Sequence, residues 1–146
     1  MALATSLLLM VPSNPAGTID GSLLQGAQIL VVDDDDDARE LLHAVLEYCG
    51  AQVLLAASPR RALATLDRIR PHVIVCDIVM PGDDGYAFIR AVRTRARLRG
   101  VPIVALTAYG FAHTAEEVLA AGFTAYLRKP VEPWKLCRTI ARLREE

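Results

Sequence analysis

Short apolar runs alternate with amphipathic segments from Gln28 to the C-terminus. The clearest run, Ile29-Leu30-Val31-Val32, has no polar interruption, as is typical of a strand buried on both faces of a parallel sheet. Further strand-like segments follow, each separated from the next by enough chain for a helix. They are Gln52 to Ala56, Val73 to Asp77, Val101 to Leu106 and Thr124 to Arg128. This alternation predicts an α/β domain with a doubly wound parallel sheet.

The segments between the strands carry apolar residues at three- and four-residue steps, which predicts helices. Asp35 or Asp36 is placed to cap the first helix, and Gly50 to end it. Ser58 and Pro59 are typical of the start of the next helix. The first helix has its apolar face at Ala38, Leu41, Leu42, Val45, Leu46 and Cys49. The later helices are expected around Phe88 to Ala96, around Thr114 to Ala121, and from Pro133 onward.

Polar residues follow the predicted strands at the point where each strand ends. Asp33 and Asp34 open a run of five aspartates after the first strand, Asp77 ends the third, and Thr107 and Lys129 follow the last two. Because parallel strands share one carboxyl edge, we expect these side chains to lie together. Carboxylate oxygens suit Mg²⁺, lysine and threonine suit phosphoryl oxygens, and an aspartate can itself become an aspartyl phosphate. The rest of the aspartate run is interpreted as helix cap and solvated loop.

Composition and charge narrow the class of protein. The 146 residues are 53% hydrophobic and 23% charged, a balance that fits one compact domain. The formal net charge of −1 gives no overall basic field for nucleic acid. Five arginines between residues 90 and 99 are interpreted as a solvated helix face running into a loop, the alternative being contact with an acidic partner. Three cysteines without C-x-x-C spacing argue against a disulfide framework or zinc site and favour a reducing compartment, the cytoplasm.

The N-terminal segment has a different character from the rest of the chain. Its apolar stretch, Leu3 to Val11, is too short to span a bilayer and lacks the positive region of a secretory signal. Asn14-Pro15-Ala16-Gly17 is typical of a linker. We therefore expect residues 1–26 to form a flexible extension and residues 27–146 to form the domain.

Four motifs, in order and each at a strand end, carry a resemblance to a known family. They are Val31-Val32-Asp33-Asp34, Cys76-Asp77-Ile78-Val79-Met80-Pro81 with Gly85, Ala105-Leu106-Thr107-Ala108, and Tyr126-Leu127-Arg128-Lys129-Pro130. From about Gln28 the chain resembles a response-regulator receiver domain of bacterial two-component signalling, the CheY-like fold. The resemblance implies a flavodoxin-like, five-stranded parallel sheet of order 2-1-3-4-5 flanked by five helices.

The same resemblance implies a role for each site residue. Asp77 would accept a phosphoryl group, and Thr107 and Lys129 would hold it. Mg²⁺ would be bound by Asp34 directly, by Asp33 mostly through a water, by Asp77 and by the backbone carbonyl of Val79. Tyr126 would be the switch aromatic that turns inward when Thr107 moves. The Lys129-Pro130 peptide is expected to be cis in this family.

The resemblance also implies partners. A histidine kinase or histidine phosphotransfer protein would supply the phosphoryl group, so the chain would be a signalling phosphoacceptor that catalyses only its own phosphorylation and dephosphorylation. The output face would comprise the last helix, the short helix before it and the strand between them. The last helix and the neighbouring strand are also a candidate dimer surface. Nucleic acid and membrane are not expected as partners. The chain is either a single-domain regulator or a receiver excised from a larger protein such as a hybrid kinase.

Two residues flanking the expected path of an attacking water depart from the best-known chemotaxis member. Val79 is apolar where a polar side chain is common, and Tyr109 is bulky. Neither residue orients water, so we predict an acyl phosphate that hydrolyses slowly. A half-life of seconds under native conditions would contradict this.

Other functions fit the sequence less well. A haloacid-dehalogenase-type phosphatase also uses an aspartate after its first strand, but Asp36-Asp37-Ala38 follows the acids here and the chain has no room for a cap domain. A phosphorylation-independent interaction domain would not need the intact set of acids, threonine and lysine. A P-loop or dinucleotide-binding domain would carry a glycine-rich motif after the first strand, and this sequence has none there.

Overall fold

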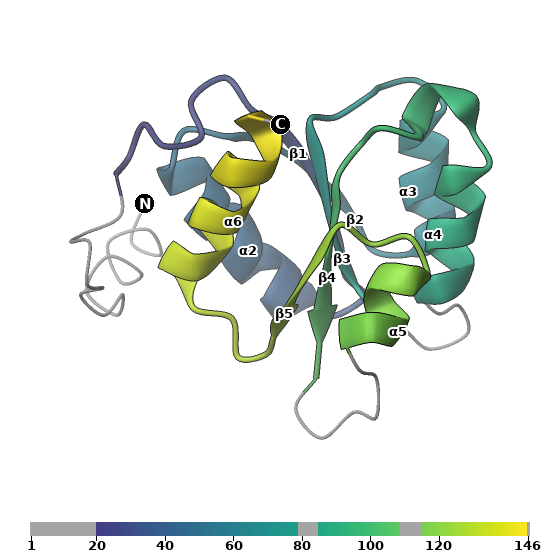
Figure 1. Cartoon of the computed structure of the whole chain (residues 1–146). Coiled ribbons are helices and arrows are strands. Elements are labelled where there is room, and N and C mark those ends of the chain that lie inside the picture. Colours follow the sequence, from purple (N-terminus) through teal and green to yellow (C-terminus); the bar gives the residue numbers. More distant parts are fainter. Residues whose placement is uncertain (1–19, 79–84, 109–114, 146) are drawn as a thin grey trace.

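The computed structural model describes residues 20–78, 85–108 and 115–145, which form a parallel sheet with helices on both faces (Figure 1). The sheet has five strands in the order β2-β1-β3-β4-β5, so the predicted flavodoxin-like order is confirmed. The strands are β1 (Gln28–Val32), β2 (Gln52–Ala56), β3 (Val73–Asp77), β4 (Ile103–Thr107) and β5 (Ala125–Arg128).

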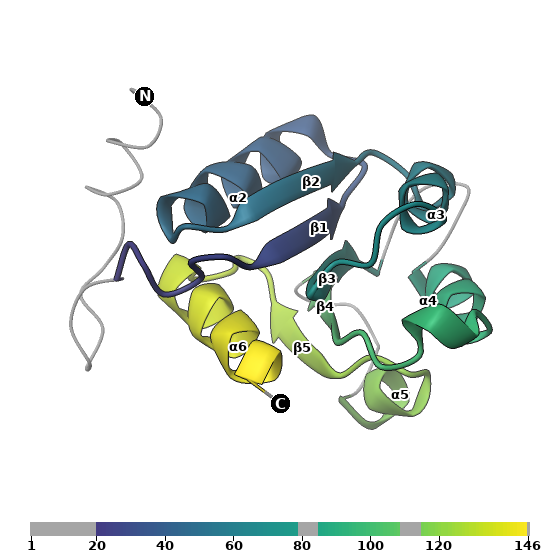
Figure 2. The ribbon, with the colours of Figure 1, turned by 90° about the horizontal axis from the view of Figure 1, so that it is seen from above.

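The helices form two layers around the sheet. Viewed from above, α2 and α6 lie on one side of the central strands and α3, α4 and α5 on the other (Figure 2). The described helices are α2 (Asp36–Tyr48), α3 (Pro59–Leu66), α4 (Gly85–Arg93), α5 (Ala115–Ala120) and α6 (Pro133–Glu145), with a short 3₁₀ turn η1 (Ala96–Leu98). Among the described residues, no helix is both long enough and apolar enough to cross a bilayer.

The expected capping residues start the first two helices, and the expected glycine follows the first helix. The Asp35 carboxylate accepts hydrogen bonds from the amides of Asp37 (2.9 Å) and Ala38 (3.2 Å), which satisfies two of the free N–H groups at the start of α2. Ser58 caps α3 by accepting from the Arg61 amide at 3.2 Å. Gly50 follows α2 with φ at +93°, the left-handed conformation that glycine adopts most easily.

Two hydrophobic clusters lie on opposite faces of the sheet because alternate strand residues point to opposite sides. Ile29 and Val31 pack with α2 and α6, whereas Leu30 and Val32 pack with α3 and α4. Every residue of β3 and β4 is buried. The carboxyl ends of these central strands are therefore held by packing on both faces, which fixes the position of the polar residues that follow.

Two sequence-based expectations about surface and core are wrong. Leu41 was expected on the buried face of α2, but it is 46% exposed, because it lines an open hollow together with Pro133 and Leu136 of α6. Arg93 was expected on a solvated helix face, but it is half-buried and its guanidinium donates to the carbonyls of Gly122 (2.9 and 3.1 Å) and Val101 (2.8 Å). Burial lowers the pKa of Arg93. The hydrogen bonds of this arginine connect the end of α4 to the turn before β5.

Residues 20–26, which the sequence placed with the extension, pack against the domain. Leu24 is fully buried in the cluster beneath α2 and α6. Its amide donates to the Cys49 carbonyl at 2.8 Å, and Arg144 donates to the Gln25 carbonyl at 2.7 Å. Residues 1–19 lie outside the described residues, so a flexible extension there stays a prediction.

Leu24→Ala is expected to lower the free energy of unfolding by about 2–5 kcal/mol, because it removes a fully buried leucine and leaves a cavity. Urea unfolding followed by circular dichroism measures the change. Leu41→Ala is the matched control, since its side chain is 46% exposed and should cost about 1 kcal/mol or less. Equal losses for the two variants would contradict the packing of the N-terminal segment.

Candidate functional site

Three aspartates meet at the carboxyl edge of the sheet. Asp33 follows β1, Asp34 comes next, and Asp77 is the last residue of β3. One carboxylate oxygen from each lies within 4.8 Å of the other two. Asp33 is fully buried and Asp77 is 6% exposed, whereas Asp34 faces solvent. The neighbouring parallel strands thus produce the juxtaposition that the strand ends predicted.

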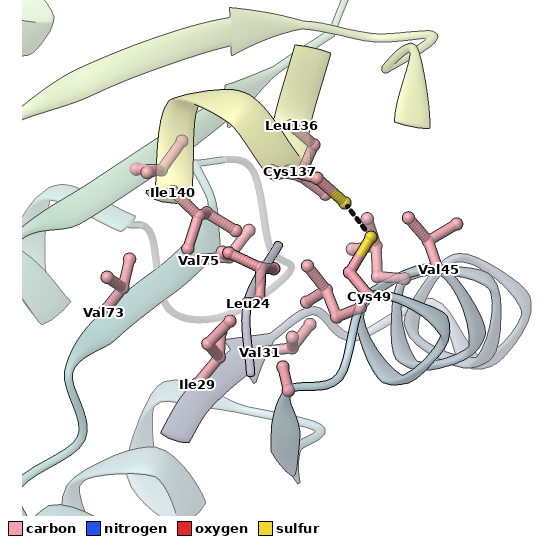
Figure 3. Packing of buried hydrophobic residues seen from close by; sticks show 14 of the residues in the cluster. Leu24, Ile29, Val31, Val45, Cys49, Val73, Val75, Leu136, Cys137 and Ile140 are labelled. Carbon is pink, nitrogen blue, oxygen red and sulfur yellow. Dashed lines mark hydrogen bonds between the residues drawn. The ribbon is translucent and has the colours of Figure 1, made fainter. Parts of the chain in front are cut away.

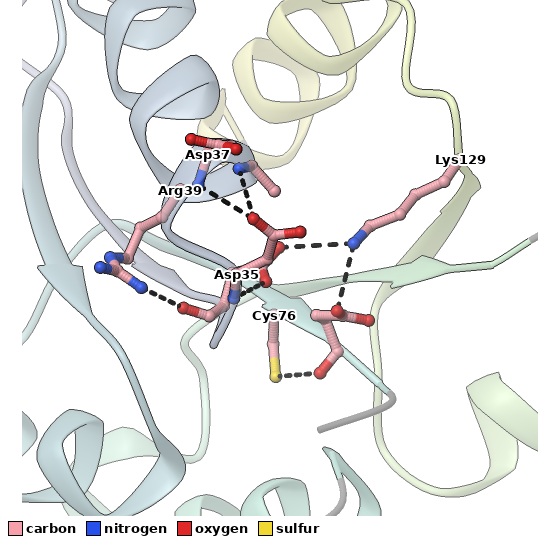
Figure 4. Close-up of polar contacts among 8 residues, drawn as sticks. Asp35, Asp37, Arg39, Cys76 and Lys129 are labelled. Carbon is pink, nitrogen blue, oxygen red and sulfur yellow. Dashed lines mark hydrogen bonds and ion pairs between the residues drawn. The ribbon is translucent and has the colours of Figure 1, made fainter. Parts of the chain in front are cut away.

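Lys129 brings a positive charge to this cluster from the end of β5 (Figure 4). Its Nζ atom lies 3.1 Å from Asp77 Oδ2 and 3.4 Å from Asp33 Oδ2. Burial of the ammonium disfavours its charged form, but attraction to Asp77 and then Asp33 outweighs burial and raises the pKa of Lys129. The Lys129-Pro130 peptide is cis.

Thr107 ends β4 beside Asp77 and is 5% exposed. Its carbonyl accepts a hydrogen bond from the Lys129 amide at 2.7 Å, so the ends of β4 and β5 are joined directly. The structure therefore places Thr107 at the end of the strand that lies between the strand of Asp77 and the strand that precedes Lys129.

Burial of Asp33 opposes its ionisation. Burial is the largest cause that raises the pKa of this carboxyl, and repulsion from Asp77 adds to it. The Asp35 amide, which donates to Asp33 Oδ1 at 2.9 Å, and the Lys129 ammonium only partly offset the increase. Lys129 pairs with two of the three clustered carboxylates, those of Asp33 and Asp77, so a further cation would be favoured electrostatically at this cluster.

Arg39 supports the site and was missed by the sequence reasoning. Its Nη1 donates to the Asp33 carbonyl at 2.8 Å, and its Nη2 lies 2.5 Å from Asp36 Oδ1. The side chain is only 17% exposed. The i, i+3 spacing of Asp36 and Arg39 in α2 was the available signal. Arg39 thereby holds the backbone of the loop that presents the first acids.

Cys76, directly before Asp77, is a core residue as expected. It is fully buried, and its thiol donates to the Asp77 carbonyl at 3.2 Å. Burial, followed by repulsion from Asp77 and Asp33, raises the pKa of this thiol well above its ordinary value. A reactive thiolate is therefore disfavoured at this position.

The remaining predicted residues lie away from the acid cluster or outside the described residues. Tyr126 is half-buried in β5, opposite Ala105 of β4, and packs against the cluster formed with α3 and α4. Its role as a switch stays a prediction. Val79, the expected source of a metal-binding carbonyl, and Tyr109 lie outside the described residues.

Comparison with known proteins decides the family. The model of the response regulator receiver domain matches residues 29–141. The chain belongs to this family. As a receiver domain it is a signalling module of two-component systems, and the match sets aside the haloacid-dehalogenase alternative.

Relatives of this receiver domain differ in overall length. An uncharacterized 14.6 kDa protein of Leptolyngbya boryana is 43% identical over 77% of this chain and 86% of that protein. Response regulator Rre1 of Synechocystis is 38% identical over 74% of this chain, but the receiver domain spans only 47% of Rre1. The solved receiver domain of sensor histidine kinase PA1611 from Pseudomonas aeruginosa, with a magnesium ion coordinated in its active site cleft, has a TM-score of 0.76 and 34% identity, covering 83% of this chain and 99% of that one.

Proposed function

We propose that this receiver domain takes a phosphoryl group from a phosphohistidine onto Asp77. The observation that carries the proposal is the contact between the Lys129 ammonium and Asp77 Oδ2, at 3.1 Å, inside a cluster of three carboxylates. A carboxylate can act as the nucleophile in phosphoryl transfer, and a nearby ammonium stabilises the charge on the transferred group. The donor would be a histidine kinase or a histidine phosphotransfer protein.

The proposed reaction exchanges one bond to phosphorus for another. An Asp77 carboxylate oxygen forms a bond to phosphorus while the phosphorus–nitrogen bond of phosphohistidine breaks, and its electron pair leaves with the imidazole nitrogen. Packing of β3 on both faces holds Asp77 in place, so the protein acts mainly by positioning and electrostatics. Lys129 and the Thr107 hydroxyl would hold oxygens of the transferred group. Hydrolysis later returns free Asp77 and phosphate.

The donor set fits Mg²⁺. Three carboxylate oxygens within 4.8 Å of one another are hard ligands, and they include a buried acid whose ionisation a cation would favour. Asp33, Asp34 and Asp77 would hold the ion together with the carbonyl of Val79, and the magnesium ion in the PA1611 receiver domain supports this assignment. When bound, Mg²⁺ supplies positive charge to the phosphoryl oxygens.

Mg²⁺ is expected to raise the melting temperature, because its site exists only in the folded state. At ten times the dissociation constant the stabilisation is about 1.4 kcal/mol, or roughly 3–6 °C. Differential scanning fluorimetry with and without Mg²⁺ measures the shift. Asp34→Asn should abolish it and is safe for folding because Asp34 is exposed, whereas exposed Asp37→Asn should retain it. A shift that survives Asp34→Asn would contradict the site.

Incubation with acetyl phosphate and Mg²⁺ is expected to add one phosphoryl group, detected by intact mass. Asp77→Asn should prevent the addition, because an amide oxygen is a poor nucleophile, while Asp37→Asn should still be labelled. A retained adduct in Asp77→Asn would contradict the assignment of Asp77. Absence of both adduct and released phosphate in the wild type, despite Mg²⁺ binding, would favour a phosphorylation-independent interaction domain.

The proposed output face comprises α5, β5 and α6. Tyr126 lies on β5, which pairs with β4 through to Thr107, so a change at Thr107 has a short route to this face. The downstream target would be a protein that binds this face, and a dimer through α6 and β5 belongs to the same proposal. Slow hydrolysis of the acyl phosphate is part of the same proposal, because Val79 and Tyr109, the residues that the family resemblance expects to flank the path of an attacking water, do not orient water.

A further inference from the structure

Two cysteines from distant parts of the chain meet in the hydrophobic cluster that lies beneath α2 and α6. Cys49 directly follows α2, and Cys137 lies in α6, 88 residues later. Their Sγ atoms are 3.0 Å apart, closer than two sulfur atoms in ordinary van der Waals contact. Figure 3 shows the two thiols pointing toward each other, one from the end of α2 and the other from α6. Both residues are fully buried.

The surroundings of this pair favour sulfur chemistry between the two thiols over chemistry with other groups. Their neighbours in the cluster are aliphatic, among them Leu24, Val45 and Leu136. The hydrogen bond between the thiols lowers the pKa of Cys49 and raises that of Cys137. One member is thus the better nucleophile, and the other is a protonated partner in contact with it.

We propose that Cys49 and Cys137 are a modification site that closes into a reversible disulfide under a low-molecular-weight disulfide oxidant of the glutathione type. The Cys49 thiolate attacks one oxidant sulfur, and the oxidant's own disulfide breaks to release one thiol. Cys137 then attacks Cys49 Sγ and expels the second thiol. The protein dithiol loses two electrons and two protons, and the oxidant disulfide gains them.

The two sulfur atoms already lie close to bonding distance. A disulfide has sulfurs 2.03–2.05 Å apart, so the two atoms need to approach by about 1 Å. Because both thiols are buried, the oxidant reaches them only when α6 opens locally or while the chain folds. In a reducing compartment such a bond is transient and formed under oxidative conditions, in contrast to a permanent structural disulfide. This inference is independent of the proposed phosphoryl transfer.

The cross-link would join the end of α2 to α6 and constrain the unfolded chain across 88 residues. Closing a loop of that length removes much unfolded-chain entropy, so the oxidised protein is expected to melt about 10 °C higher than the reduced protein. Cys76 provides an internal control, because its thiol contacts the Asp77 carbonyl instead of a second sulfur.

The test refolds the full chain from urea in a buffer of reduced and oxidised glutathione, which gives the oxidant access to every thiol. Alkylation and peptide mass mapping then identify the product. We expect a Cys49–Cys137 disulfide, a free Cys76, a native circular dichroism spectrum and the higher melting temperature. Cys49→Ser and Cys137→Ser should each abolish both the bond and the temperature gain, while Cys76→Ala should keep them. Recovery of three free thiols, of glutathione adducts alone, or of a bond to Cys76 would overturn the proposal.

Discussion

Lys129→Met is expected to slow the phosphorylation of Asp77 by about 10²- to 10³-fold, the usual cost of removing one preorganised donor to a developing charge. Methionine keeps most of the length of the side chain but removes the ammonium that lies 3.1 Å from Asp77 and 3.4 Å from Asp33. The rate of adduct formation from acetyl phosphate at saturating Mg²⁺, followed by intact mass, measures the effect. Lys135→Met is the control, since Lys135 is exposed on α6 and should leave the rate unchanged.

The same substitution has a pH-dependent effect on stability. Folding raises the pKa of Lys129, so the charged lysine adds to the free energy of unfolding. This contribution is complete below the pKa of lysine in the unfolded chain, near 10.4, and is lost as the pH rises through the higher pKa of the folded protein. The stability difference between wild type and Lys129→Met should therefore be constant from pH 7 to pH 9 and shrink above about pH 10.5.

In the phosphorylation experiment, a rate loss of less than about threefold, or one shared by Lys135→Met, would contradict the role of Lys129.

Gly85→Ala is expected to lower the free energy of unfolding by about 1–3 kcal/mol, as an overpacked position does. A Cβ atom at residue 85 would lie 2.7 Å from Ile78 Cα and 3.1 Å from the Asp77 carbonyl oxygen. Both contacts are with backbone, and the Gly85 amide already donates to the Ile78 carbonyl at 2.7 Å. Relief of the overlap therefore has to move the end of β3, which carries Asp77. Weaker Mg²⁺ binding is expected to accompany the loss of stability.

Urea unfolding and isothermal titration with Mg²⁺ measure the two effects. Gly100→Ala is the matched control, because a Cβ there would meet only the end of the Arg70 side chain at 3.5 Å, an ordinary contact. It should change neither quantity appreciably. If Gly85→Ala matched the control in both measurements, the close approach of α4 to β3 would not constrain the site.

The fold and most of the site could be predicted because both depend on one strong pattern. Buried parallel strands need continuous apolar runs, and those runs end on the residues that bear the chemistry. Asp33, Asp77, Thr107 and Lys129 are brought together by strand order alone. The caps Asp35 and Ser58 were also predictable, since capping is a local interaction within a few residues of sequence.

The parts that could not be predicted depend on contacts between distant segments. Periodicity identifies a helix face but not how much of it a second helix covers, so Leu41 was expected to be buried. Leu24 precedes the first strand in a stretch without periodicity, and only the tertiary structure brings it under α2 and α6. An arginine in a charged run looks solvated, yet Arg93 finds backbone carbonyls on two other segments.

The packing of residues 20–26 also decides where the domain can be joined to another protein. The family match begins at residue 29, and the first strand at Gln28, so a chimera designed from either would be fused near residue 27. Such a junction would discard Leu24, leave the Cys49 carbonyl without the amide that donates to it, and remove the Gln25 carbonyl that receives Arg144. A graft that begins at Asp20 keeps Leu24 in the core and keeps the hydrogen bonds that Leu24 and Gln25 make with the domain.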